Sequence, residues 1–250
     1  VTDMTIKDND LVVATQGRAF YVLDDLSVLQ QMNPDFLNEN LHVFNVNPAW
    51  RIGGGGRFRG NFGTPRNAGA NPPNGPVINY YVKDITDSTK ASIMIMDKDK
   101  KMIKTFSTNS KENRFDIGKG MNQFVWDMLY PEAERVEGMI LWTGVPRSIL
   151  APPGQYFYKM KVGKDSAEGN FVIKADPNYK CSQEDYDAQF AFLQTVSNKF
   201  NEVQKGIKDI RSLRSQINDF VARQGKDCPK EVKQMSDRKN PELHALEGPF

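Results

Sequence analysis

The chain has 250 residues, of which 39% are hydrophobic and 26% are charged, and its formal net charge is +2. This composition is typical of a globular protein with a packed core, and the length suits one large or two small domains. The small net charge argues against a nucleic-acid-binding protein. No window of about 18 apolar residues occurs, so the sequence predicts no membrane span.

The N-terminus and the two cysteines offer no chemistry of their own. Val1 is not followed by a signal-peptide pattern, and we expect an internal fragment or a processed product of a longer chain. Cys181 and Cys228 flank a predicted helix, which at about 40 residues would be roughly 60 Å long. A disulfide requires Cα atoms within about 7 Å, so two free thiols are expected.

Residues 1–27 predict short β-strands separated by turns. The apolar runs lie at 4–6, 11–14 and 19–23, with turn clusters at 7–10 and 17–18. A hairpin of this size is not stable alone, so we expect it to pair with a segment outside this chain or to add to the later sheet.

Residues 28–76 predict a connector. Ser27 is placed to cap a short helix over Val28 to Met32, and Leu41 to Val46 suits a short strand. Within 53–76, Gly and Pro fill 12 of 24 positions, a composition typical of a flexible loop. A phosphate-binding loop is not indicated, because GxxxxGK[ST] is absent.

Residues 77–176 predict an antiparallel, immunoglobulin-like β-sandwich. Phe124 and Trp126 fall on one face of a strand and are predicted to lie in the core. The spacing of the strands, without intervening helices, favours this fold class. The predicted strands cover 77–83, 91–97, 102–107, 123–128, 155–162 and 170–174.

Residues 182–250 predict a helical region. Apolar residues recur every three or four positions over 182–223, which is typical of a long amphipathic helix in a helical hairpin or coiled coil. Ser182 and Asp185 suit a capping box, Gly225 and Pro229 suit its end, and a second helix is expected from near Pro229. The apolar stripe should be covered by the parent chain or by an oligomer partner.

Two parts of the sequence resemble a known family. Residues 10–25 (DLVVATQGRAFYVLDD) resemble the end of the β-propeller in bacterial BNR-repeat proteins related to sortilin, which are often labelled glycosyl hydrolases. Residues 71–81 (NPPNGPVINYY), 122–131 (NQFVWDMLYP) and 150–156 (LAPPGQY) resemble the following sandwich. That module is similar to the immunoglobulin-like domain of flagellar hook-capping proteins. The helix with Asp187 to Phe190 near its start also fits this family.

The resemblance implies a secreted or periplasmic protein with a multi-blade propeller upstream, of which residues 1–27 are the last blade fragment. The Asp-box pattern of such repeats, Ser-x-Asp-x-Gly-x-x-Trp, does not occur in this chain. No catalytic residue is therefore carried over, and the hydrolase label follows from fold alone.

The polar candidates point to no active site. Asp24 and Asp25 are adjacent, and neighbours on a strand face opposite sides, so a turn or capping role is favoured over a glycosidase pair. Asp84, Asp87, Asp97 and Asp99 lie near turns and match no calcium loop, and His42 and His244 lie far apart in the sequence without a catalytic motif. We predict no catalytic residues, no metal site and no cofactor.

Trp142 is the candidate ligand platform, in the segment 138–144 (GMILWTG). The favoured function is a non-catalytic structural or interaction module at the C-terminal end of a propeller protein, with the upstream propeller and a protein or carbohydrate as partners. The alternatives are an accessory carbohydrate-contacting domain of a glycoside hydrolase and a sortilin-type peptide receptor. Whether the parent protein is a glycoside hydrolase is not decided by the sequence.

Overall fold

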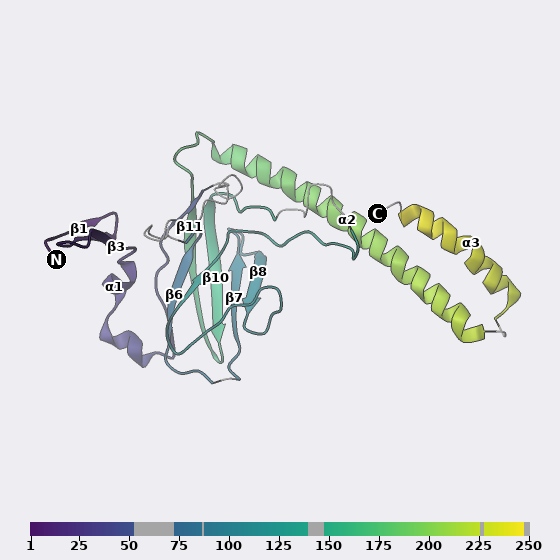
Figure 1. Ribbon diagram of the computed structural model, residues 1–250, viewed down its shortest axis with the longest axis horizontal. Coiled ribbons are helices and arrows are strands. Elements are labelled where there is room, and N and C mark those ends of the chain that lie inside the picture. Colours follow the sequence, from purple (N-terminus) through teal and green to yellow (C-terminus); the bar gives the residue numbers. More distant parts are fainter. Residues whose placement is uncertain (53–72, 87, 140–147, 226–227, 248–250) are drawn as a thin grey trace. The chain divides into compact units, whose positions relative to one another are not determined.

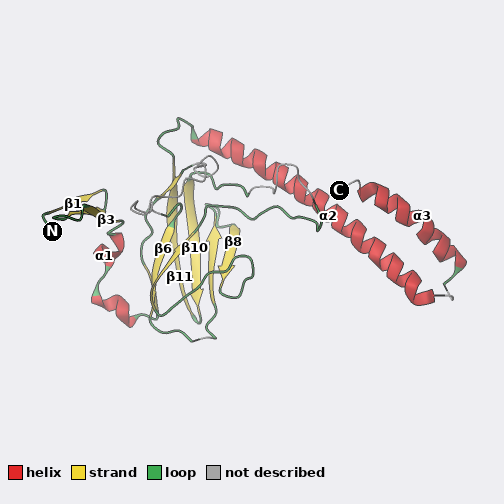
Figure 2. Ribbon diagram, viewed as in Figure 1, coloured by secondary structure: helices red, strands yellow, loops and turns green. Residues whose placement is uncertain are grey.

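The computed structural model describes residues 1–52, 73–86, 88–139, 148–225 and 228–247 (Figures 1 and 2). It contains several antiparallel sheets and a long C-terminal helix, as the sequence predicts. The chain divides into two compact units. The first unit comprises 1–130 and 150–187, and the second comprises 131–149 and 188–250.

The N-terminus forms a three-stranded antiparallel sheet, here called the N-terminal sheet. It consists of β1 (Asp3–Lys7), β2 (Asp10–Ala14) and β3 (Phe20–Leu23), in that order. Asp8 and Asn9 close the first turn with φ of 49° and 77°, which is the backbone that a two-residue hairpin turn requires. In the described part of the chain these strands pair only with one another, so they do not extend the later sheets.

The stretch predicted as a connector contributes two strands to the later sheets. It contains α1 (Ser27–Gln31), the 3-10 helix η1 (Pro34–Asn38), β4 (Leu41–Val43) and β5 (Ala49–Arg51). β4 pairs with β6, and β5 pairs with β11. β4 lies within the short strand predicted over Leu41 to Val46, whereas no strand was predicted at the position of β5. Three-residue strands are too short to show an alternating pattern.

Two sheets follow. One has the order β5-β11-β10-β7-β8 and the other has the order β4-β6-β9. All pairs are antiparallel except β5 with β11, which is parallel. The remaining strands are β6 (Val77–Val82), β7 (Ala91–Met96), β8 (Met102–Ser107), β9 (Gly120–Val125), β10 (Gly154–Val162) and β11 (Asp165–Ala175).

One hydrophobic core draws its side chains from both sheets. Alternate residues of β6, β7 and β10 are buried, as expected for strands with one face toward a core. Phe124 and Trp126 lie in this core, so their predicted burial is confirmed. The arrangement is compatible with the predicted β-sandwich. The largest fully buried side chains of the core are Trp126, Tyr80, Phe171, Ile78, Ile93, Ile95, Met128, Met160 and Ile173.

The C-terminal region is helical, as predicted. α2 (Gln183–Gln224) has 42 residues, which at 1.5 Å per residue corresponds to about 63 Å. The backbone N–H of Ser182 donates to Asp185 Oδ2, and that of Asp185 donates to Ser182 Oγ, so the predicted capping box is confirmed. Gly225, with φ of 53°, follows the helix, and α3 (Lys230–Glu247) begins directly after Pro229. None of the helices in the described ranges has the length and apolar character that crossing a membrane requires.

Candidate functional site

The predicted polar candidates have local structural roles where the structure describes them. Asp25 Oδ1 accepts hydrogen bonds from Asn9 Nδ2, the Ser27 N–H and Asn47 Nδ2, at 2.8–3.0 Å. Its φ of 56° places it in a tight turn between β3 and α1. This carboxylate holds the N-terminal sheet to the connector, which is the turn role that the sequence favours.

The other aspartates near turns behave similarly. Asp97 Oδ1 accepts from the N–H groups of Asp99 and Lys101. Asp84 forms an ion pair of 2.7 Å with Lys119, which lowers the pKa of the Asp84 carboxyl. Asp87 lies outside the described residues. Within the described ranges, no group of three His, Cys, Asp or Glu residues is arranged to hold a metal ion.

The two histidines are not brought into a common described site. His42 Nδ1 lies 2.9 Å from Glu39 Oε2, and its ring packs edge-on against Phe44 with centroids 4.8 Å apart. The same aromatic group includes Phe36 and Tyr81. The side chain of His244 lies outside the described part of the chain, so the structure does not test a site that includes it. Trp142 also lies outside the described residues, and its role as a ligand platform stays a prediction. Cys181 and Cys228 are free thiols, as predicted.

The apolar residues of α2 follow a heptad repeat that is regular across most of the helix. With Leu193 at position a, every a and d position from 193 to 221 is apolar except Arg214. We call this line the α2 seam. Its residues are Leu193, Val196, Phe200, Val203, Ile207, Ile210, Arg214, Ile217 and Val221.

The segment 131–139 covers the middle of the seam. The Val136 N–H donates to Gln204 Oε1 at 3.0 Å, and both residues are buried together with Ile207. Lys208 Nζ binds Glu134 Oε2 at 2.7 Å, and this ion pair lowers the pKa of the Glu134 carboxyl. The segment 131–139 is thereby held to α2 by a hydrogen bond from Val136 and an ion pair from Glu134.

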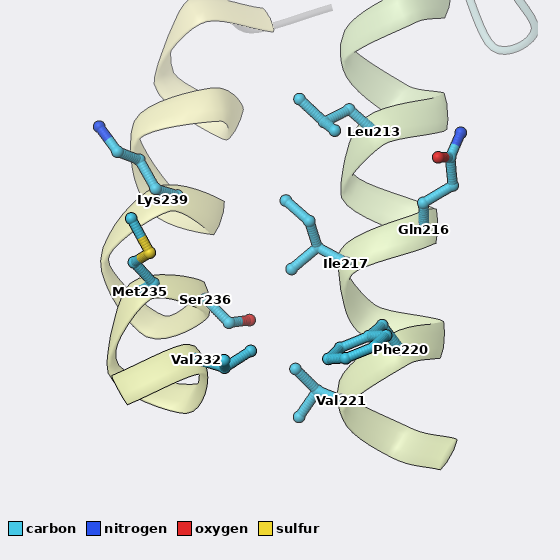
Figure 3. Close-up of a pocket in the computed structure, with 9 residues that line it drawn as sticks. All are labelled: Leu213, Gln216, Ile217, Phe220, Val221, Val232, Met235, Ser236 and Lys239. Atoms are coloured by element: carbon cyan, nitrogen blue, oxygen red, sulfur yellow. The ribbon is translucent and has the colours of Figure 1, made fainter. Parts of the chain in front are cut away.

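α3 covers the C-terminal part of the seam. It packs along the end of α2, and Asn240 Nδ2 donates to Asn218 Oδ1 at 2.8 Å. An apolar groove of about 360 Å³ lies between the two helices. Figure 3 shows Ile217, Phe220 and Val221 of α2 facing Val232 and Ser236 of α3.

The N-terminal part of the seam stays open in the described structure. α3 has 18 residues against 42 in α2, so it reaches less than half of the longer helix. Phe192 beside the seam is 68% exposed, and Leu193, Val196 and Val203 on the seam are also exposed. An apolar row on a helix is normally buried against a partner.

The N-terminal sheet is the second open apolar surface. Six of its large apolar side chains are more than half exposed. Four of them occupy consecutive positions on β3, so both faces of that strand carry apolar groups, which is unlike a sheet with one face in water. These residues are Met4, Ile6, Phe20, Tyr21, Val22 and Leu23.

No protein-family model and no curated protein matches this chain. The sequence predicts the apolar stripe of α2, because helical periodicity is strong over 42 residues. It does not predict which part of the stripe is covered. That depends on the segment 131–139, which has no periodicity of its own.

Proposed function

We propose that this chain is a non-catalytic interaction module with two protein-docking surfaces, the N-terminal sheet and the open part of the α2 seam. The observation that carries the proposal is the distribution of exposed apolar side chains. The large apolar side chains of the two central sheets are mostly buried in one core. In contrast, β3 and residues 192–203 of α2 expose rows of large apolar side chains. Contiguous apolar surface of this kind is typical of a binding interface.

The N-terminal sheet is proposed as part of a terminal propeller blade. Supporting this, it is a three-stranded meander that pairs with no other described strand, and both faces of β3 are apolar. A propeller blade packs between two neighbouring blades, so both of its faces are buried in the assembled protein. The resemblance of residues 10–25 to BNR-repeat propellers, in secreted or periplasmic proteins, agrees with this role.

The central sheets are proposed as an immunoglobulin-like scaffold that joins the two surfaces. Asp25, Asn47 and Ser27 hold the N-terminal sheet at one end. At another point Tyr186 of α2 is buried beneath the Arg51 guanidinium, 4.9 Å from its ring centroid. These contacts hold the end of the N-terminal sheet and the start of α2.

The test introduces a charge into the N-terminal sheet of two proteins, the 250-residue chain and a longer form that includes the proposed upstream propeller. Val22 is 55% exposed in this chain, so Val22→Asp should change the melting temperature of the 250-residue protein by less than about 2 °C. In the protein extended upstream through its propeller, the same carboxylate would be buried. We expect the melting temperature to fall by at least about 5 °C there, since buried unpaired charge is costly.

Arg18→Asp is the matched control, because Arg18 is exposed in the turn between β2 and β3. It should have a small effect in both lengths. Equal small effects of Val22→Asp in both lengths would show that the N-terminal sheet docks on nothing upstream, and the proposal would fail.

A further inference from the structure

A cleft of about 1110 Å³ lies in the first unit, beside the turns of the N-terminal sheet. Its walls are the turns of the N-terminal sheet at 8–10 and 24–25, the stretch 47–52 that contains β5, and the outer ends of β6 and β9. A cavity of this size accommodates several sugar rings or a short peptide. The identity of its lining side chains decides between ligand classes.

Neutral amides form the floor of the cleft. Asn79 of β6 and Gln123 of β9 are directly paired across the two strands, and both line the cleft. Gln123 Nε2 donates to Asn79 Oδ1 at 3.2 Å. Within the described residues this leaves Asn79 Nδ2 and Gln123 Oε1 as a donor and an acceptor without partners, and Asn74 adds a further amide nearby. Such pairs suit a ligand that both donates and accepts hydrogen bonds.

An indole ring stands at the wall of the cleft. Trp50 of β5 is 44% exposed, although Trp is usually well buried. The Lys174 ammonium lies over the ring, 5.3 Å from its centroid, so one face of the indole is already covered. The other face is a flat apolar surface, and Trp50 lines the same cleft as Asn79 and Gln123.

The charges of the cleft exclude several ligands. Among the described lining residues none is Lys, Arg or His, so phosphates, carboxylates and nucleic acids are not favoured. The carboxylate of Asp25 already accepts three hydrogen bonds, and Asp10 Oδ1 accepts the Asp25 N–H at 2.9 Å. Asp8 forms an ion pair of 2.9 Å with Lys7, and Asp24 also lines the cleft.

We propose that this cleft binds a neutral saccharide. The Trp50 ring packs against the apolar face of a sugar ring, and Asn79 and Gln123 hydrogen-bond its hydroxyl groups. A flat aromatic surface beside uncharged donors and acceptors matches a molecule with an apolar ring face and an edge of hydroxyls. The inference does not rest on the protein-docking function, because the cleft uses neither the α2 seam nor β3. The aromatic platform of this proposal is Trp50, and the structure does not describe Trp142, the candidate from the sequence.

The test measures binding of four neutral hexasaccharides to the 250-residue protein by titration calorimetry. The probes are the β-1,4-linked hexamers of glucose, xylose and N-acetylglucosamine and the β-1,3-linked hexamer of glucose. We expect at least one to bind. Trp50→Ala should weaken that binding at least tenfold, and Asn79→Ala should weaken it severalfold. Trp142→Ala is the matched control and should leave binding unchanged.

Fold is checked by thermal unfolding of each variant. If Trp50→Ala unfolds, Trp50→Phe replaces it, and Asn79→Ala still decides the outcome. Three results would overturn the proposal. They are no binding of any probe at 10 mM, unchanged affinity in the Trp50 and Asn79 variants, or loss of binding in Trp142→Ala alone. None of these results bears on the docking of the N-terminal sheet.

Discussion

Tyr80 and Tyr156 are two core tyrosines whose hydroxyl groups differ in their hydrogen bonding. Tyr156 donates to the Pro152 carbonyl at 2.7 Å, whereas the Tyr80 hydroxyl is buried without a partner among the described residues. Burial raises the pKa of Tyr80 to about 12 and also raises the pKa of Tyr156. Both phenols are therefore neutral at physiological pH, and among the described residues only the Tyr156 hydroxyl has a hydrogen-bond partner.

This difference predicts opposite effects of removing each hydroxyl. Tyr80→Phe should raise the free energy of unfolding by about 1 kcal/mol, because it removes an unsatisfied buried polar group. Tyr156→Phe should lower it by about 1 kcal/mol, because it leaves the Pro152 carbonyl without its donor. Urea unfolding of the two variants measures both. A loss above about 1 kcal/mol in Tyr80→Phe would mean that its hydroxyl has a partner.

Individual residues could be predicted where a strong pattern surrounds them. Trp126 lies in the alternating pattern of the predicted strand 123–128, two residues from Phe124, and it is buried although it directly follows the end of β9. Trp50 gives no such signal, because β5 has three residues and lies in a stretch that looks like a connector. Its exposure beside Asn79 arises from pairing of β5 with β11, more than 120 residues later in the chain.

At the scale of elements, α2 contains a glycine at a position where neither the backbone conformation nor the surrounding space demands one. Gly206 lies in the helix interior, and a Cβ added there would meet no atom within 4 Å. Gly206→Ala should stabilise the helix by about 0.5–1 kcal/mol, because Gly loses more backbone freedom on folding. Helical circular dichroism during urea unfolding measures this change.

Gly225 provides the contrast at the end of the same helix. Its φ of 53° is a left-handed conformation, so Gly225→Ala should destabilise by about 1 kcal/mol instead. If both alanine variants shift stability in the same direction, the helix does not end at Gly225 as described.

Elements with long, regular patterns were predicted closely. The strands over 77–83, 91–97 and 102–107 and the helix over 182–223 each fall within a residue or two of β6, β7, β8 and α2. β9 begins three residues before the prediction and β11 begins five residues before it. Both extensions contain glycines and polar residues that are held by the neighbouring strand more than by their own propensity.

At the scale of the whole molecule, the sequence indicates which segments are apolar but not which of them remain uncovered. Coverage of the α2 seam depends on the short reach of α3 and on the segment 131–139, in which the Val136 N–H binds Gln204. Exposure of β3 depends on the N-terminal sheet pairing only with itself in the described structure. Both are tertiary outcomes with no local signature, and both carry the proposed function.

Hydrogen exchange followed by mass spectrometry tests the central proposal most directly. Backbone amides of β1 to β3 would be compared between the 250-residue chain and a longer protein that includes the proposed upstream propeller, with β10 as the internal reference. We predict fast exchange of the N-terminal sheet in the short chain and at least 100-fold slower exchange in the long one, while β10 stays equally protected in both. Equally fast exchange of the N-terminal sheet in the two proteins would contradict its role as a docking surface.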